Sequence, residues 1–108
     1  MTVLDKISAR KAPFKERYGN FIGGQWVEPA DGRYFENTSP INGKVITSIA
    51  RSSAVDVDRA LDAAHAAREA WGHTAPAARA RILNLIADRM EENLELIATA
   101  ETWDNGKP

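Results

Sequence analysis

The chain has 108 residues, 44% hydrophobic and 27% charged, a balance typical of a globular chain rather than a disordered one. Its net charge of −1 provides no positive surface for a nucleic acid or an anionic membrane. The absence of cysteine excludes a disulfide, a zinc–thiolate site and a cysteine nucleophile within these residues. No apolar run is long enough for a signal peptide or a membrane span, so we expect a cytoplasmic protein without nucleic-acid or membrane partners.

Residues 1–19 form a basic N-terminal extension in this interpretation. The excess positive charge comes from Lys6, Arg10, Lys11, Lys15 and Arg17. A basic arm and a mitochondrial-type targeting sequence are two possible interpretations of this pattern. We favour a third, a frayed extension, because the first residues of a domain are often poorly ordered.

Residues 20–27 predict a tight β-hairpin. Two short apolar runs flank Gly23 and Gly24, and a two-residue primed turn needs a positive φ at both of its central positions. The following residues, 28–32, contain proline, aspartate and glycine and are therefore expected to be a loop.

A second hairpin is predicted from two further extended segments, 34–38 and 44–50. The first stops at Ser39-Pro40, and the second is rich in β-branched residues. The Asn42-Gly43 pair between them is a turn signal.

The second half of the chain predicts three helices. Ser53 and Asp56 have the spacing of a capping box at the start of the first helix, and Gly72 is expected to end it. Thr74, with proline two residues later, is expected to start the second helix, and Asn93 to separate it from a short third one. Apolar residues recur at helical spacing throughout: Val57, Leu61 and Trp71, then Ile82, Leu85, Ile86 and Met90, then Leu94 and Ile97.

The expected fold class is therefore α+β, with two β-hairpins followed by three helices. Each helix has a single apolar stripe that something must cover, and two-stranded ribbons are marginally stable alone. We expect part of this apolar surface to face a partner outside these residues.

No residue pattern in the chain predicts catalysis or nucleotide binding. His65 and His73 lack a neighbouring acid or nucleophile at a spacing that implies a catalytic pair, so each is interpreted as a surface or inter-helix histidine. Gly23-Gly24 lies between two strands rather than between a strand and a helix, and no phosphate-binding glycine motif occurs.

Five stretches, in order, resemble the start of the NAD(P)-dependent aldehyde dehydrogenases. They are "NFIGGQWV" at 20–27, "NTSPINGKVITSIA" at 37–50, "DVDRALDAAHAAREAW" at 56–71, "RARILNLIADRMEENLELIATAE" at 79–101 and "ETWDNGKP" at 101–108. The second is similar to an N-P-x-x-G-x-V/I segment, with serine at position 39 where asparagine is commoner, and the last to an E-x-x-D-x-G-K-P signature. Trp103 and Asn105 within "ETWDNGKP", together with "YFEN" and "MEENLEL", look most like bacterial acetaldehyde dehydrogenases.

The resemblance implies that residues 20–108 are the incomplete, outer N-terminal part of a cofactor-binding domain in an α/β enzyme. Such an enzyme oxidises a small aldehyde, such as acetaldehyde, to a carboxylic acid with NAD or NADP. The resemblance also implies a cysteine nucleophile, a glutamate-activated water and a homo-oligomer, either a dimer or a tetramer. The absence of cysteine excludes the nucleophile from this chain. The resemblance implies that the general base, the oxyanion asparagine and the cofactor-binding strands lie further along, so we expect no catalytic or cofactor-binding residues here and an inactive isolated chain.

The same resemblance implies a possible monovalent cation site, for K+ or Na+, at Asn37, Thr38 and Asp104. A carboxylate combined with main-chain carbonyls suits a hard cation. The alternative is that Asp104 caps the helix or makes a local hydrogen bond near the helix end.

A different class of function also remains open. The chain could be a stand-alone interaction or oligomerisation module that reuses this part of the fold. An open reading frame that continues past Pro108 into a cysteine-containing segment would favour the enzyme, and a stop codon directly after Pro108 would favour the module.

Overall fold

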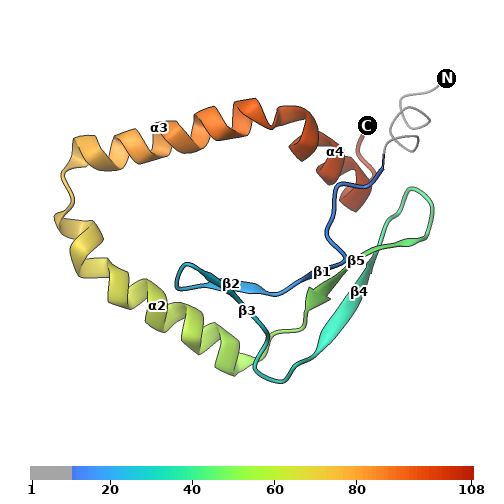
Figure 1. Ribbon diagram of the computed structural model, residues 1–108, viewed down its shortest axis with the longest axis horizontal. Helices are drawn as coiled ribbons and strands as arrows, with labels where there is room; N and C mark the ends of the chain where they lie inside the picture. The colour runs from blue at the N-terminus through green and yellow to red at the C-terminus, as the bar shows by residue number, and fades with distance from the viewer. Residues whose placement is uncertain (1–10) are drawn as a thin grey trace.

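A computed structural model describes residues 11–108 as an open frame of strands and helices (Figure 1). The strands are β1 (Arg17–Tyr18), β2 (Asn20–Ile22), β3 (Gln25–Val27), β4 (Tyr34–Thr38) and β5 (Val45–Ala50). The helices are α2 (Ala54–His73), α3 (Pro76–Glu92) and α4 (Leu94–Asn105). The element order confirms the predicted α+β class, with two hairpins followed by three helices.

The first hairpin forms as predicted, with β2 antiparallel to β3. Gly23 and Gly24 have φ values of 61° and 78°, the left-handed conformations that favour glycine and that a primed turn requires. Phe21 pairs directly with Trp26, and their ring centroids lie 5.2 Å apart. Both side chains remain largely exposed, although Lys15 Nζ lies 5.5 Å from the centroid of the Trp26 ring and the Tyr18 ring lies 6.3 Å from it.

The second hairpin is part of a three-stranded sheet with the order β1–β5–β4. β4 and β5 are antiparallel, as expected, and their register shifts between Asn37 and Thr38. β1 pairs in parallel with β5, with Arg17 opposite Ser48. The sequence interpretation did not anticipate β1, which lies within the predicted N-terminal extension; residues 1–10 of that extension lie outside the described residues.

Helix α2 begins as predicted but ends later than expected. Ser53 is its N-cap and forms a capping box with Asp56. The prediction that Gly72 ends the helix is wrong, because α2 continues to His73. The end is set by Thr74, whose N–H donates to the Trp71 carbonyl and whose Oγ1 donates to the Ala70 carbonyl.

The other two helix boundaries lie close to their predicted positions. Pro76 is the first residue of α3, but Ala75, rather than Thr74, is its N-cap. Asn93 separates α3 from α4, as predicted. Its backbone N–H and its side-chain Nδ2 both bond to the carbonyl of Arg89, and these bonds close the last turn of α3.

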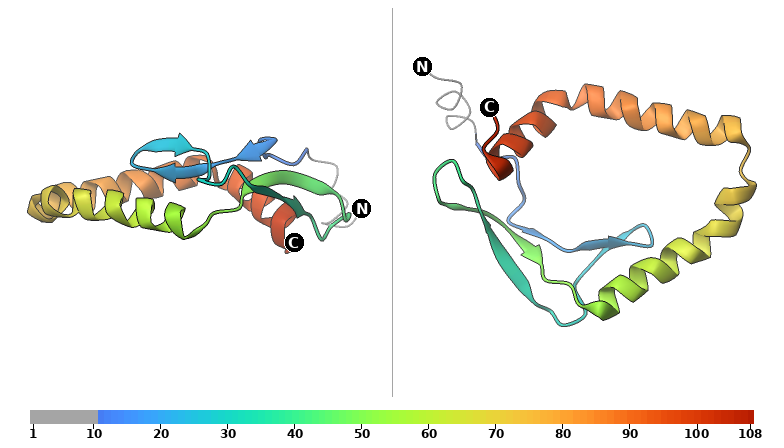
Figure 2. Two further views of the ribbon diagram at one scale, coloured as in Figure 1. Left: turned by 90° about the horizontal axis from the view of Figure 1, so that it is seen from below. Right: turned by 180° about the vertical axis from the view of Figure 1, so that it is seen from behind.

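The helices do not fold back onto the sheets to form a compact core. The radius of gyration is 17.7 Å, whereas a compact chain of this length would have about 13 Å. The molecule is a flat frame, 53 × 37 × 17 Å, and Figure 2 shows its thin edge. Among the described residues, Ala50 and Trp103 are the buried hydrophobic residues.

Apolar side chains on all three helices remain exposed. The most exposed include Val57, Leu61, Leu83, Leu85, Met90 and Leu94. This arrangement confirms the expectation that the helices carry uncovered apolar surface. No helix in residues 11–108 combines the length and the apolar character needed to cross a membrane.

Candidate functional site

The last helix meets the end of strand β4, and this contact closes the frame. Ser39 is 1% exposed, and its Oγ donates a 2.5 Å hydrogen bond to the carbonyl of Trp103. The same Oγ accepts from the N–H of Ile41 at 3.2 Å. Ser39 therefore links two segments that are 64 residues apart in the sequence. We call residues 37–40 and 102–106 the β4–α4 junction.

Two of the three residues predicted to bind a cation meet in this junction. Asn37 Nδ2 donates to Asp104 Oδ1 at 2.8 Å. Thr38, the third predicted residue, follows Asn37 at the end of β4, at the register shift, and is exposed. The structure thus brings the predicted residues to one end of the sheet.

The side chains in the junction supply only some of the oxygen ligands that a monovalent cation needs. Asp104 is the one carboxylate among the three residues, and the described residues contain no group of three or more His, Cys, Asp or Glu side chains suited to a metal ion. Main-chain carbonyls would have to supply the other ligands. Because the Asn37 amide already donates to Asp104, the contact also serves as a direct structural tie.

Gly106 ends α4 and lies against Pro40. Its φ is 78°, and its N–H donates to the Thr102 carbonyl at 2.8 Å, as in a glycine-capped helix. A Cβ at this position would lie 3.3 Å from Pro40 Cγ, closer than most real Cβ contacts. The end of "ETWDNGKP" is therefore a helix stop that docks on the residues following β4.

Trp103 provides the apolar part of the junction. It is 5% exposed, and its Nε1 is buried without a hydrogen-bond partner within the described residues. An unpaired buried donor costs about 1–3 kcal/mol. The polar tie of Trp103 to β4 is therefore made by its backbone carbonyl, which accepts the bond from Ser39.

Asp56 forms a second long-range tie, at the start of α2. Its Oδ2 accepts from the N–H of Ser53 at 2.9 Å, and its Oδ1 accepts from the N–H of Ala30 at 2.8 Å. The bond from Ser53 is the main cause that lowers the pKa of Asp56; burial of the carboxylate opposes it, and the bond from Ala30 adds to the lowering. The sequence predicted the cap but not the contact with Ala30, which is 26 residues away.

The two histidines do not form a catalytic arrangement. His65 and His73 are exposed and line a shallow pocket at the C-terminal end of α2, together with Arg68, Glu69 and Gly72. The observed position agrees with the interpretation of both as surface residues.

Comparison with known proteins gives a consistent assignment. The model of the Aldehyde dehydrogenase family matches residues 26–108. An aldehyde dehydrogenase of Paracoccus denitrificans is 70% identical over 96 residues, which cover 89% of this chain and 19% of that protein. An acetaldehyde dehydrogenase of Pseudomonas aeruginosa is 62% identical over 94 residues, covering 87% of this chain and 19% of that protein.

The fold of the chain also matches a solved structure. An apo indole-3-acetaldehyde dehydrogenase matches with a TM-score of 0.88 and 31% identity, over 100% of this chain and 26% of that chain. The chain thus spans about a fifth of the length of the curated relatives that it matches. The resemblance seen in the five sequence stretches is confirmed.

Proposed function

Since this chain belongs to the aldehyde dehydrogenase family, we propose that it is the N-terminal segment of an enzyme that oxidises an aldehyde to a carboxylic acid with NAD+ or NADP+. The observation that carries the proposal is the 70% identity to the Paracoccus denitrificans aldehyde dehydrogenase. The use of NAD is supported by a similar indole-3-acetaldehyde dehydrogenase structure that contains NAD+. The reaction requires groups that this segment does not supply.

The proposed substrate is acetaldehyde or a similar small aldehyde. The similarity to the Pseudomonas aeruginosa acetaldehyde dehydrogenase supports it. A long-chain-aldehyde dehydrogenase of an Acinetobacter species is 58% identical, so long-chain aldehydes must be compared in the same assay. Faster oxidation of a long-chain aldehyde than of acetaldehyde by the intact protein would overturn the choice of a small substrate.

The role of this segment is structural in the proposed enzyme. With no cysteine, the chain cannot form the covalent thiohemiacetal that a cysteine nucleophile makes with an aldehyde. We expect the isolated chain to produce no NADH from acetaldehyde above background, as followed by absorbance. Turnover that persists after dialysis of the pure chain would contradict this assignment.

A chimera tests the family function directly. In it, this chain replaces the matching segment of the Paracoccus denitrificans relative, and NADH formation from acetaldehyde is measured. We expect activity within about a factor of ten of that relative, because substitutions away from special features usually change stability little. A soluble chimera without aldehyde oxidation would count against the proposal.

A monovalent cation at the β4–α4 junction is a secondary proposal. The 2.8 Å contact between Asn37 and Asp104 supports it, because it brings a carboxylate to the end of β4 beside Thr38. Crystals of the intact enzyme soaked in Rb+ or Tl+ would test it through anomalous scattering. No site-specific density beside Asp104 would leave the contact as a structural tie only.

The intact enzyme is proposed to be a homo-oligomer, a dimer or tetramer, and a cytoplasmic location remains a prediction. The alternative is a stand-alone interaction or oligomerisation module. The reading frame distinguishes the two, since the enzyme requires a continuation past Pro108 into a cysteine-containing segment. A stop codon at that point, with a stable 108-residue protein in cells, would favour the module.

A further inference from the structure

Two asparagine residues of the chain are followed directly by glycine. They are Asn42, in the turn between β4 and β5, and Asn105, the last residue of α4. An asparagine before glycine is prone to deamidation, because glycine has no Cβ to hinder the approach of its backbone nitrogen to the preceding side chain. The sequence makes the two pairs equally prone to this reaction, so a difference between them must come from the structure.

Deamidation of an asparagine needs no reactant other than water. The backbone nitrogen of the glycine loses its proton and attacks Cγ of the asparagine side chain, and the side-chain nitrogen leaves as ammonia. Water then opens the resulting succinimide ring at either carbonyl, which yields aspartate or isoaspartate. No electron is gained or lost, and the product carries a negative charge that asparagine lacks. The reaction therefore requires a glycine N–H free of its hydrogen bond and a backbone that can bring this nitrogen against Cγ.

The structure holds the Asn105-Gly106 pair away from this reaction. Asn105 lies in the last turn of α4. Its Nδ2 donates to Glu101 Oε1 at 3.3 Å, and its Oδ1 accepts from the N–H of Lys107 at 2.8 Å. The N–H of Gly106 donates to the Thr102 carbonyl at 2.8 Å, and Gly106 lies against the residues that follow β4. Attack on Asn105 would therefore require the end of α4 to unwind within the β4–α4 junction.

The Asn42-Gly43 pair is held only by bonds within its own turn. Both residues are exposed. Asn42 Oδ1 accepts from the N–H of Lys44 at 3.0 Å, and the N–H of Gly43 donates to the Ser39 carbonyl at 2.9 Å. The space beside Gly43 is open, since a Cβ at this position would meet no atom within 4 Å. Opening of this turn alone therefore frees the Gly43 nitrogen, without the unwinding of a helix.

We propose that Asn42 is a site of spontaneous deamidation and that the fold protects Asn105. The two sites differ in the backbone segment that has to open, and an exposed turn opens at a lower free energy than the end of a helix that is tied to a strand. The reaction adds a negative charge to a chain whose net charge is −1, so acidic forms of the protein should accumulate with age. The reaction needs only water and does not depend on the proposed function.

Ageing of the intact protein tests the proposal. The purified protein is incubated at mildly alkaline pH, both folded and in urea, and peptide mass spectrometry follows the conversion of each asparagine to aspartate or isoaspartate. In the folded protein, we expect Asn42 to convert at least about tenfold faster than Asn105, because Asn105 reacts only after local unfolding. The rate at Asn42 should rise with pH, since the attacking nitrogen must lose its proton. In urea, the two rates should agree within about threefold, because the fold no longer distinguishes the sites.

Two matched variants assign the products. Asn42→Gln and Asn105→Gln each lengthen the side chain by a methylene group, which disfavours ring closure, so each should abolish conversion at its own position only. Conversion of Asn105 as fast as that of Asn42 in the folded protein would overturn the proposal. Absence of conversion at Asn42 in the folded protein would also overturn it, whatever happens in urea. A tenfold preference that persists in urea would contradict it as well, since the preference would then come from neighbouring residues and not from the fold.

Discussion

The hydroxyl of Ser39 lies 2.5 Å from the carbonyl oxygen of Trp103, although 64 residues separate them. This bond joins the end of a strand from the first half of the chain to the last helix. Both residues are buried, in a molecule that otherwise buries little. The junction they form is therefore the contact that closes the frame, and the first predictions concern it.

We expect Ser39→Ala to loosen the C-terminal end of α4. The substitution leaves the buried carbonyl of Trp103 without its side-chain donor, which costs about 1–3 kcal/mol. Hydrogen exchange of α4 peptides in the chimera should accelerate by about fivefold to 150-fold, since 1.4 kcal/mol corresponds to a factor of ten. Ser48→Ala is the control, because the Ser48 hydroxyl donates a longer, 3.5 Å bond to the Phe35 carbonyl. Equal effects of the two variants would show that Ser39 does not tie α4 to the sheet.

Gly106→Ala should disturb the same region for a different reason. An alanine at a φ of 78° is strained by about 1–2 kcal/mol, and its Cβ would crowd Pro40. Exchange at the end of α4 in the chimera should therefore accelerate by about 5-fold to 30-fold. The double variant with Pro40→Ala removes the crowding but leaves the backbone strain, so it should restore part of the protection. If the double variant behaves like the single one, the contact with Pro40 contributes nothing.

The helix start at Asp56 should make the isolated chain sensitive to acid. The native-state pKa of Asp56 is lowered, so its stabilisation is present above the unfolded pKa and is lost as the pH falls through the lower native value. Circular dichroism of the wild type should lose helical signal below about pH 4. Asp56→Asn should have less helix at neutral pH and a smaller acid-induced loss. Asp58→Asn, at an exposed position of the same helix, is the control and should follow the wild type.

The isolated chain should remain expanded in solution and bind a hydrophobic dye. Ala50 and Trp103 are the buried hydrophobic residues of the described part, which is too small a core for a cooperative domain. Small-angle scattering should give a radius of gyration well above the roughly 13 Å of a compact chain, and 8-anilinonaphthalene-1-sulfonate fluorescence should rise on addition of the protein. A compact radius without dye binding would show that the helices collapse onto the hairpins.

The turns, helix caps and helix breaks named below were predictable because each depends on neighbours within a few residues. The turn at Gly23-Gly24, the cap at Ser53 and the break at Asn93 all appear where the sequence placed them. The helix end predicted at Gly72 was wrong, since a glycine within a helix costs only about 1 kcal/mol and does not by itself end the helix. Pro76 limits the helix more strongly than Gly72 does, because proline disfavours the helical conformation of the residue that precedes it.

The candidate site was predictable only through resemblance. Asn37 and Asp104 were placed together by a family pattern, and their contact spans 67 residues that no local rule connects. Strand β1 was missed because two residues carry no periodicity, and its partner β5 lies about thirty residues away. Ser39 was noted as a strand end and as a departure from the commoner asparagine, but neither observation predicted its contact with α4, since a serine before proline has the same local signal whether or not it meets a helix.

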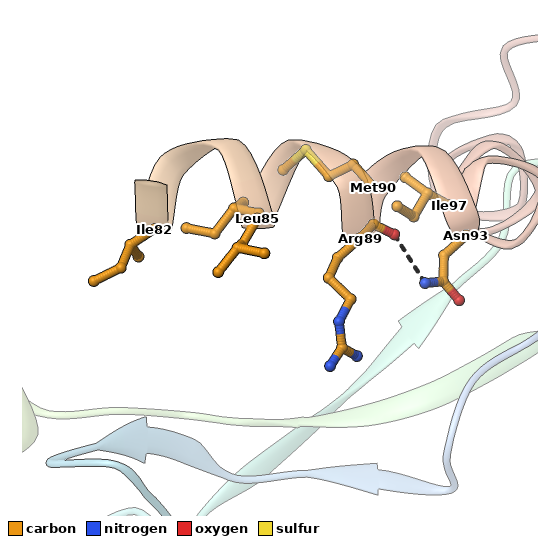
Figure 3. Close-up of a pocket in the computed structure, with 7 residues that line it drawn as sticks. Ile82, Leu85, Arg89, Met90, Asn93 and Ile97 are labelled. Atoms are coloured by element: carbon orange, nitrogen blue, oxygen red, sulfur yellow. Dashed lines mark hydrogen bonds between the residues drawn. The ribbon is translucent and has the colours of Figure 1, made fainter. Parts of the chain in front are cut away.

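The sequence by itself determined the order of the two hairpins and three helices, the turn at Gly23-Gly24, the cap at Ser53 and the apolar stripe of each helix. These features follow from backbone conformation and helical spacing, which act over one to four residues. Only the tertiary structure decided that Ser39 meets Trp103, that Asp56 holds the loop at Ala30, and that Ile82 and Arg89 leave α3 on the side where the strands lie, as Figure 3 shows. The reason is that each of these relationships depends on the path of the whole chain between the residues it joins.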